Sequence, residues 1–219
     1  ISWEDCYWAG NDTRALDWAH ASAVSDGGDH YIVSLRNIDT VLAVGKGDGA
    51  DAAVAWSLSS RAPAINSTFA FGDDASMFYN PHDAQVVGVT GDDALRLMLF
   101  DDGNNRPGCE TDGFDEEAGC FSRAVRYALD FDARVATIEW QFEYDTLFRS
   151  DASPAALKED DLFVSDGGSV TDWDDKYVFF AFTVTTRSSR YGGYAWVFQV
   201  DKYNASKVYS HVRVARELW

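Results

Sequence analysis

The sequence lacks any apolar run long enough to cross a membrane. A membrane-spanning helix needs about 20 consecutive apolar residues, whereas the most apolar stretch, YVFFAFTV at 177–184, has the length of a single strand. Basic residues are also scarce, because 18 Lys and Arg stand against 36 Asp and Glu, for a formal net charge of −18. A surface this acidic repels nucleic acid and anionic lipid, so we expect no nucleic-acid partner and no membrane insertion.

Cysteine is rare, with three in 219 residues. Cys109 and Cys120 bracket the segment CETDGFDEEAGC, and a disulfide between them is the simplest prediction, which leaves Cys6 over for a partner outside this chain. Three Asn-X-Ser/Thr sequons match the N-glycosylation pattern: Asn11, Asn66 and Asn204. Together these features predict a glycoprotein of a secreted or lumenal compartment.

The acidic loop ETDGFDEEAG, at 110–119, holds the one cofactor candidate in the sequence. Its carboxylates are suitable ligands for Ca²⁺, but their spacing is not that of an EF-hand loop. We therefore expect no cofactor, with Ca²⁺ at this loop as the alternative.

Aromatic residues and short strand-like runs are abundant. The chain has eight Trp, ten Tyr and fourteen Phe, residue types that favour strands over helices. Gly, Asp and Asn turns separate the runs. They fall into three sets of four, at 20–26, 30–37, 40–47 and 53–60; at 82–91, 95–103, 122–131 and 135–144; and at 167–175, 177–184, 193–201 and 207–217.

Repeated four-stranded units predict an all-β fold built as a β-propeller, with blades at about 20–60, 82–144 and 167–217. A sandwich of the same strands would not explain the repeated order of motifs. Closed propellers typically have about four to eight blades, so three blades leave the ring open. We expect residues 1–219 to form a single propeller portion. Either it is half of a six-bladed ring that lacks its N-terminal half, or two copies close one ring.

Two of the four histidines begin the first strands of the first two sets. His20 lies in DWAHASAV and His82 in NPHDAQVV. The first strand of each propeller blade lines the central channel, so we predict that both histidines face the channel mouth. His30 and His211 are more typical of structural histidines.

Polar turns follow the second strand of the same two sets. SLRN supplies Arg36 and Asn37, and FDDGNNRPG supplies Asn105 and Arg106. The guanidinium fork of Arg fits the oxygens of sulfate, phosphate or carboxylate, and a neutral His can act as base or nucleophile near neutral pH. The repeat therefore predicts an anion site in the channel.

Taken in order, these motifs resemble those of the arylsulfotransferase (aryl-sulfate sulfotransferase) family. The order is DWAHASAV, YIVSLRN, VAWSL, NPHDAQVV, FDDGNNRPG and SRAVRYALD. The resemblance covers most of residues 15–145, is weaker beyond, and places the chain in the C-terminal half of such a protein. It implies a six-bladed propeller that transfers a sulfuryl group from an aryl sulfate ester to a phenolic acceptor, without a nucleotide donor, through a histidine.

The resemblance also implies roles for individual residues. His20 and His82 match active-site histidines, and Arg106 matches the arginine that binds the sulfate oxygens. The candidates for further substrate binding are Arg36, Asn37 and Asn105.

The sequence departs from the family pattern in two places. The sulfurylated histidine of the family falls in the blade after SRAVRYALD, where this chain has only His211, in a different strand, and FDDG replaces the commoner F-D-N-G. Two hypotheses follow. One is an enzyme whose nucleophile is His20 or His82. The other is a catalytically inactive extracellular or lumenal propeller that serves as a scaffold or binding subunit.

Overall fold

The protein is all-β across the part of the chain that the structure describes. The computed structural model describes residues 18–62, 65–90, 94–103, 106–107, 109, 121–143, 164–173, 175–187 and 190–218. Strands dominate these ranges, and the helical segments among them are short 3-10 turns. None of the described helices is both long and apolar enough to cross a membrane.

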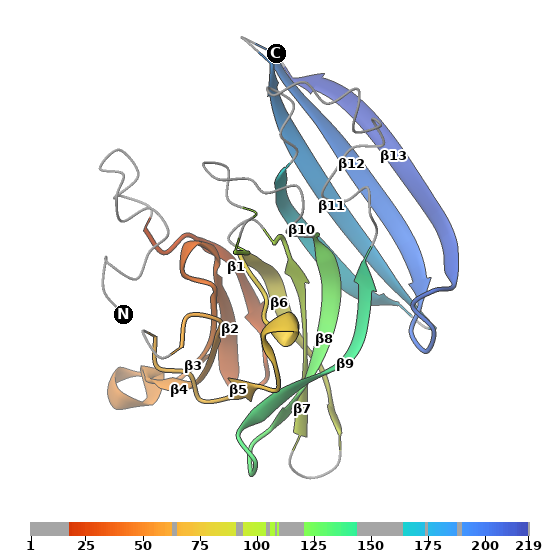
Figure 1. The fold of residues 1–219 in the computed structure, drawn as a ribbon. Helices are drawn as coiled ribbons and strands as arrows, with labels where there is room; N and C mark the ends of the chain where they lie inside the picture. Colours follow the sequence, from red (N-terminus) through yellow and green to blue (C-terminus); the bar gives the residue numbers. More distant parts are fainter. Residues whose placement is uncertain are drawn as a thin grey trace. The chain divides into compact units, whose positions relative to one another are not determined.

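The first sheet is a four-stranded antiparallel meander (Figure 1). Its strands are β1 (Ala21–Asp26), β2 (His30–Leu35), β3 (Thr40–Gly45) and β4 (Val54–Ser59). The 3-10 turn η3 (Arg36–Ile38) connects β2 to β3, and η4 (Gly49–Ala52) precedes β4. These bounds agree closely with the four runs expected over 20–60.

The second sheet has five strands, in the order β5-β9-β8-β7-β6. They are β5 (Ala70–Phe71), β6 (Pro81–Thr90), β7 (Ala94–Asp101), β8 (Arg123–Asp130) and β9 (Val135–Glu143), with the 3-10 turn η5 (Asp74–Ser76) between β5 and β6. The sequence predicts four of these strands. It misses β5, because two residues that pair in parallel with Val135 and Ala136 carry no periodic signal of their own.

The third sheet repeats the four-stranded antiparallel arrangement. Its strands are β10 (Val164–Trp173), β11 (Lys176–Arg187), β12 (Arg190–Asp201) and β13 (Val208–Leu218). The all-β class and the grouping of strands into three successive sheets are therefore confirmed. The propeller and its number of blades stay a prediction.

Two compact units divide the chain. The first holds the described residues up to Leu99 together with Arg126–Glu139, and thus the first sheet and much of the second. The second unit holds Phe100–Val125 and the chain from Trp140 onward, including the third sheet. The prediction of a single propeller portion over 1–219 is not tested by this division.

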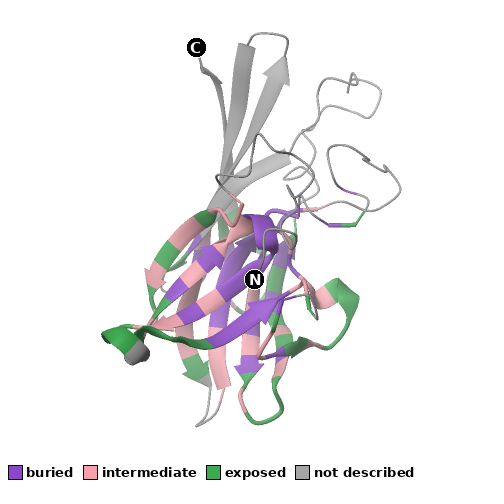
Figure 2. Ribbon diagram, turned by 90° about the vertical axis from the view of Figure 1, so that its left-hand side faces the viewer, coloured by how far each residue is buried: buried purple, intermediate pink, exposed green. Residues whose placement is uncertain are grey.

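The core of the first unit lies where the first two sheets stack. Strand β6 packs against β1 and β2. Buried positions alternate with less buried ones along β2 and β9, as expected for strands with one face in a core, whereas β4 and β7 end in runs of buried residues. Figure 2 colours the strands by burial. Fully buried apolar residues of this unit include Ile32, Val41, Ala43, Leu58, Phe78, Leu97 and Tyr127.

Several strands end on an aspartate whose carboxylate organises the turn that follows. Asp26 Oδ1 accepts a hydrogen bond from the Gly28 backbone N–H at 2.9 Å, Asp130 Oδ1 accepts those of residues 132 and 133, and Asp201 Oδ1 accepts those of residues 203 and 204. Aspartate commonly closes turns in this way, by bonding backbone groups two or three residues on. Part of the acidity of the chain therefore has a structural use.

Candidate functional site

The two predicted site histidines lie at matching places of adjacent sheets. His20 immediately precedes β1, and His82 is the second residue of β6. The first sheet and β6 both belong to the first unit, where β6 packs on β1. The repeat noticed in the sequence therefore brings the two histidine-bearing segments to neighbouring strands.

Serine side chains tie these segments together. Ser22 Oγ donates to the carbonyl of Pro81 at 3.0 Å, and Ser25 Oγ donates to the carbonyl of Ala84 at 2.6 Å. Ser34 Oγ of β2 accepts the backbone N–H of Ala84 at 3.0 Å. The register between β1, β2 and β6 is thus fixed by directional bonds next to both histidines, and not by apolar packing alone.

The Arg36 turn closes the same end of the first sheet. The backbone N–H of Arg36 donates to the carbonyl of His20 at 2.9 Å, and that of Asn37 donates to the carbonyl of Ala19 at 3.1 Å. Arg36 Nη1 donates to Asn37 Oδ1 at 3.3 Å. Arg36 and Asn37, both predicted substrate-binding residues, are therefore attached directly to the segment that carries His20.

Asp39 and Asn80 complete this framework, although neither belongs to the candidates that the motifs indicate. Asp39 Oδ1 accepts the backbone N–H of Asn80 at 2.7 Å, and Asp39 Oδ2 accepts Arg61 Nε at 2.8 Å. Asn80 Nδ2 donates to the carbonyl of Arg36 at 3.0 Å. The signal available in the sequence is an aspartate placed between apolar runs, in RNIDTVLAV, where a solvated side chain is not expected.

Left-handed backbone conformations gather in this region. His20, Asp39, Asn80 and Asp83 have φ between 47° and 52°. Residues other than glycine adopt positive φ uncommonly, although Asn, Asp and His do so more readily than most. Such conformations persist where the surrounding structure holds them, and they cluster at functional sites.

The other predicted arginine lies in the second unit, within a buried ion-pair cluster. Asp101 Oδ2 accepts Arg106 Nη2 at 2.8 Å and Arg123 Nε at 2.9 Å. Arg123 Nη1 also donates to Gln141 Oε1 at 2.8 Å. The side chains of Asp101 and Arg123 are 0% and 2% exposed, and that of Arg106 is 10% exposed. One buried carboxylate thus bonds two buried arginines, and the neighbouring Asp102 is buried as well.

The backbone around Arg106 is tightly built. The guanidinium carbon of Arg106 lies 3.9 Å from the ring centre of Phe121, in cation–π geometry. Gly103 has φ +79°, and a Cβ at this position would come within 2.1 Å of the Phe121 carbonyl oxygen. The Arg106 carbonyl accepts the N–H of Cys109, which is buried and disulfide-bonded. These contacts hold Arg106 in one place.

Several predicted site residues lie outside the described residues: Asn11, Asn105, Cys120 and the acidic loop 110–119. The Cys109–Cys120 pairing and the Ca²⁺ alternative therefore stay predictions. Within the described ranges, no group of three or more His, Cys, Asp or Glu side chains is arranged to hold a metal ion.

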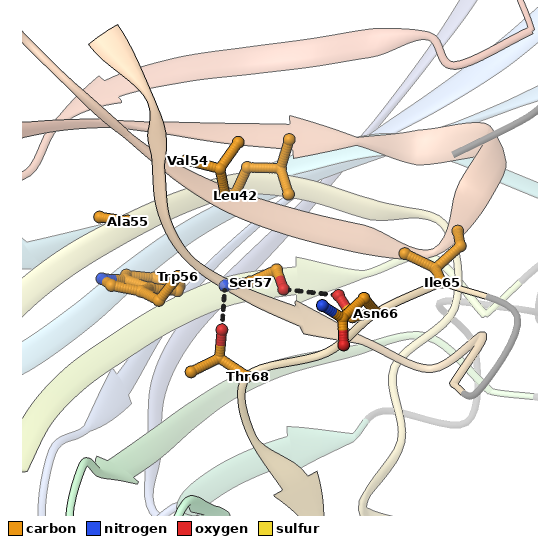
Figure 3. A pocket seen from close by; sticks show the side chains of 8 residues that line it. All are labelled: Leu42, Val54, Ala55, Trp56, Ser57, Ile65, Asn66 and Thr68. Carbon is orange, nitrogen blue, oxygen red and sulfur yellow. Dashed lines mark hydrogen bonds between the residues drawn. The ribbon is translucent and has the colours of Figure 1, made fainter. Parts of the chain in front are cut away.

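A pocket of about 310 Å³ lies on the first sheet (Figure 3). Neither His20 nor His82 is among its lining residues. Leu42, Val54 and Trp56 line it together with Ile65 and Asn66. A short segment runs along β4 here, because Ser57 Oγ donates to the Asn66 carbonyl at 2.8 Å. Asn66, a predicted glycosylation site, is exposed at the rim.

One comparison with known proteins supports the resemblance that the motifs indicate, and another finds no match. A comparison with curated proteins gives no match. A protein-family model described as Arylsulfotransferase (ASST) matches residues 4–205 of the 219. This range includes all three described sheets except the last strand, together with both candidate histidines and Arg106. The chain therefore belongs to the arylsulfotransferase (ASST) family.

Proposed function

We propose that the protein transfers a sulfuryl group from an aryl sulfate ester to a phenolic acceptor, without a nucleotide donor. The observation that carries the proposal is the framework around His20, Arg36 and His82, in which hydrogen bonds join the three segments next to these side chains. Membership of the family supports the reaction class.

The reaction divides into two displacements at sulfur. In the first, an unprotonated imidazole nitrogen of His20 or His82 attacks the sulfur, the bond from sulfur to the aryl oxygen breaks, and the phenolate leaves and takes up a proton from water. In the second, the acceptor phenol gives its proton to water as its oxygen attacks the sulfur, and the nitrogen–sulfur bond breaks to return the imidazole. Arg36 would stabilise the charge on the sulfuryl oxygens, as cations do in phosphoryl transfer.

The test uses a fluorogenic aryl sulfate as donor, phenol as acceptor and the full-length protein. It measures release of the fluorescent phenol and transfer of the sulfuryl group to the acceptor. We expect His82→Ala and His20→Ala to abolish turnover. His30→Ala is the matched control, because His30 begins β2 at the end of the first sheet opposite to His20. Turnover unchanged in both His20 and His82 variants would reject the proposed site.

A specific observation favours the alternative of a catalytically inactive propeller. Arg106, the predicted sulfate-binding residue, is buried and bonds to Asp101, which also bonds Arg123. A buried guanidinium that already bonds a carboxylate suits a structural role better than the binding of an anion. Absence of turnover by the folded full-length protein would support a scaffold or binding subunit.

We also propose that the sheets are blades of a ring completed by a further propeller half, from the same precursor or from another chain. The face of the first sheet turned away from β6 is apolar, and Val24 and Val54 on it are 63% and 55% exposed. Val24→Asp should destabilise the full-length protein if another blade covers this face. Unchanged stability would contradict the proposal.

Secretion and glycosylation are proposed on two further observations. Asn66 and Asn204 are exposed, and Cys109 is disulfide-bonded, as is typical of oxidising compartments. Asn204 Oδ1 accepts both the N–H and the hydroxyl of Ser206 in an exposed turn. Removal of N-glycans from the natively expressed protein should lower its mass, and Asn204→Gln should abolish the share contributed by that site.

A further inference from the structure

The buried carboxylate of Asp39 is shared between two parts of the candidate site. Its side chain is 1% exposed, and it bonds the Asn80 backbone N–H with one oxygen and Arg61 Nε with the other. A carboxylate in such a place is costly unless donors surround it. Arg61 is 32% exposed and can keep part of its hydration, so Asp39 is the more deeply buried partner of the pair.

The bonds of Asp39 lead directly to the residue pair before His82. Asn80 lies two residues ahead of His82, and its own side chain returns to the Arg36 carbonyl at 3.0 Å. The turn from Arg36 to Asp39 is therefore bonded to Asn80 at its first residue and at its last. Both Asp39 and Asn80 take left-handed backbone conformations, at φ 47° and 52°.

The same turn is bonded to the His20 segment on its other side. The Arg36 backbone N–H donates to the His20 carbonyl at 2.9 Å. Two segments distant in sequence thus meet at one short turn. Rotation or sliding of the Asn80 segment would move His82 relative to His20 and Arg36, and the Asp39 carboxylate opposes that movement.

We propose that Asp39 is a positioning residue that fixes His82 in register with His20 and Arg36. The inference rests on the proposed function in assigning the three side chains to one oxyanion substrate. Asp39 itself touches no substrate, and it acts through the Asn80 backbone and the Arg36 turn. A group displaced by about 1 Å can lose about a hundredfold in rate, so a positioning bond of this kind has a measurable effect on catalysis.

The first experiment measures kcat and KM for 4-nitrophenyl sulfate, with phenol as acceptor, in the full-length protein well below its unfolding temperature. We expect Asp39→Asn to lower kcat between about ten- and a hundredfold with KM changed less than about threefold. Glu139→Gln is the matched control, because this carboxylate bonds Arg96 and Arg126 elsewhere in the first unit. The control should leave kcat within about twofold of wild type.

A double variant separates position from charge. In Asp39→Asn, one amide oxygen replaces two carboxylate oxygens, so Arg61 and the Asn80 N–H compete for it and the NH₂ group clashes with the donor that loses. Asp39→Asn combined with Arg61→Gln replaces that clash of donors with an amide pair. Recovery of kcat to within about threefold of wild type is expected if the Asn80 bond is what counts. A folded double variant that stays as slow as Asp39→Asn would overturn a positioning role.

The second experiment reads the geometry without any substrate. The imidazole ¹⁵N resonances of the four histidines are compared in wild type, Asp39→Asn and Asn80→Gly, the last of which keeps the backbone conformation but removes the side-chain bond to Arg36. We expect the His82 signals to move while those of His30 and His211 stay. Unmoved His82 signals in folded Asp39→Asn would overturn the inference.

Addition of inorganic sulfate to the same samples distinguishes the two proposals. A wild-type protein in which sulfate shifts neither His20 nor His82 rejects the proposed function, while the sulfate-free spectra still decide the role of Asp39. A wild-type response to sulfate that Asp39→Asn reproduces at the same concentrations rejects the role of Asp39 and leaves the proposed function standing.

Discussion

Two buried aspartates lie at or shortly after the second strand of their predicted sets, and they bond different kinds of partner. Asp39 follows the turn after β2, the second strand of the first sheet, and Asp101 ends β7, the second of the four strands predicted for the second sheet. Asp39 bonds one arginine and one backbone N–H. Asp101 bonds two arginines, one of which is the predicted sulfate-binding residue.

The difference shows what a buried carboxylate can do at a turn. Asp39 joins segments that carry candidate side chains, and its arginine partner, Arg61, is outside the candidate set. Asp101 instead holds the candidate Arg106 itself, beside Arg123 and above Phe121. The first arrangement supports neighbouring functional groups, and the second pairs a candidate group with a buried carboxylate. Four predictions sharpen this comparison, from the largest effect to the smallest.

Asp101→Ala should be the most destabilising of these changes. It leaves the guanidinium groups of Arg106 and Arg123 buried without their carboxylate, and removal of one partner from a buried ion pair costs about 3–5 kcal/mol. Asp39→Ala should cost less, about 2 kcal/mol, because its single arginine is partly exposed. Chemical denaturation measures both free energies of unfolding. An equal or larger loss in Asp39→Ala would break the comparison.

Gly103→Ala should cost about 2–3 kcal/mol, more than Gly28→Ala at about 1 kcal/mol. The two glycines have nearly the same backbone conformation, at φ +79° and +83°. They differ in their surroundings, because a Cβ at Gly103 meets the Phe121 carbonyl oxygen at 2.1 Å and one at Gly28 meets nothing within 4 Å. Equal losses in thermal unfolding would show that the Phe121 backbone can move away.

Phe121→Leu should lower the free energy of unfolding by about 1 kcal/mol, because the ring below the Arg106 guanidinium is lost while most of the apolar volume stays. Phe121→Tyr keeps the ring face and serves as the control. A loss in Phe121→Tyr as large as that in Phe121→Leu would indicate that packing at the ring edge, and not the cation–π contact, is responsible.

Asp26→Asn should have the smallest effect, and one that depends on pH. The hydrogen bond from Lys46, aided by the Gly28 N–H, lowers the pKa of Asp26 below its ordinary value of 3.8. A lowered folded pKa stabilises the protein above the unfolded pKa, and that stability is lost as pH falls through the folded pKa. Asp26→Asn should therefore be less stable than wild type at neutral pH and equal to it in strong acid.

The neighbouring variant Asp29→Asn is the control for the replacement of a carboxylate by an amide near this turn. Asp29 accepts the Lys46 backbone N–H with its carbonyl, which the substitution keeps. Unfolding midpoints at neutral pH should therefore separate the Asp26 variant from wild type but not the Asp29 variant, and the difference for Asp26→Asn should close in strong acid. A difference for Asp26→Asn that persists in strong acid would assign its effect to side-chain shape and not to charge.

The pattern of alternating apolar residues and Asp or Gly turns was sufficient to predict the strands of all three sheets within a few residues. The same reasoning missed β5, whose two residues form a strand only because β9 lies beside them. It identified His20, His82, Arg36 and Arg106 as candidates from their repeated places. It did not identify Asp39 or Asn80, because their bonds join positions 41 residues apart.

The sequence alone determined the all-β class, the three sets of strands and the family, because period-two patterning, turn residues and ordered motifs are local properties of the chain. Only the tertiary structure decided which charges are buried and which partners they have. Burial of Asp39 and of Asp101 depends on the strands stacked around each, and the free energy of a buried carboxylate depends on the donors that reach it. Two arginines that look alike in the sequence thus differ: Arg36 belongs to a framework that carries the histidines, and Arg106 is paired with the buried carboxylate of Asp101.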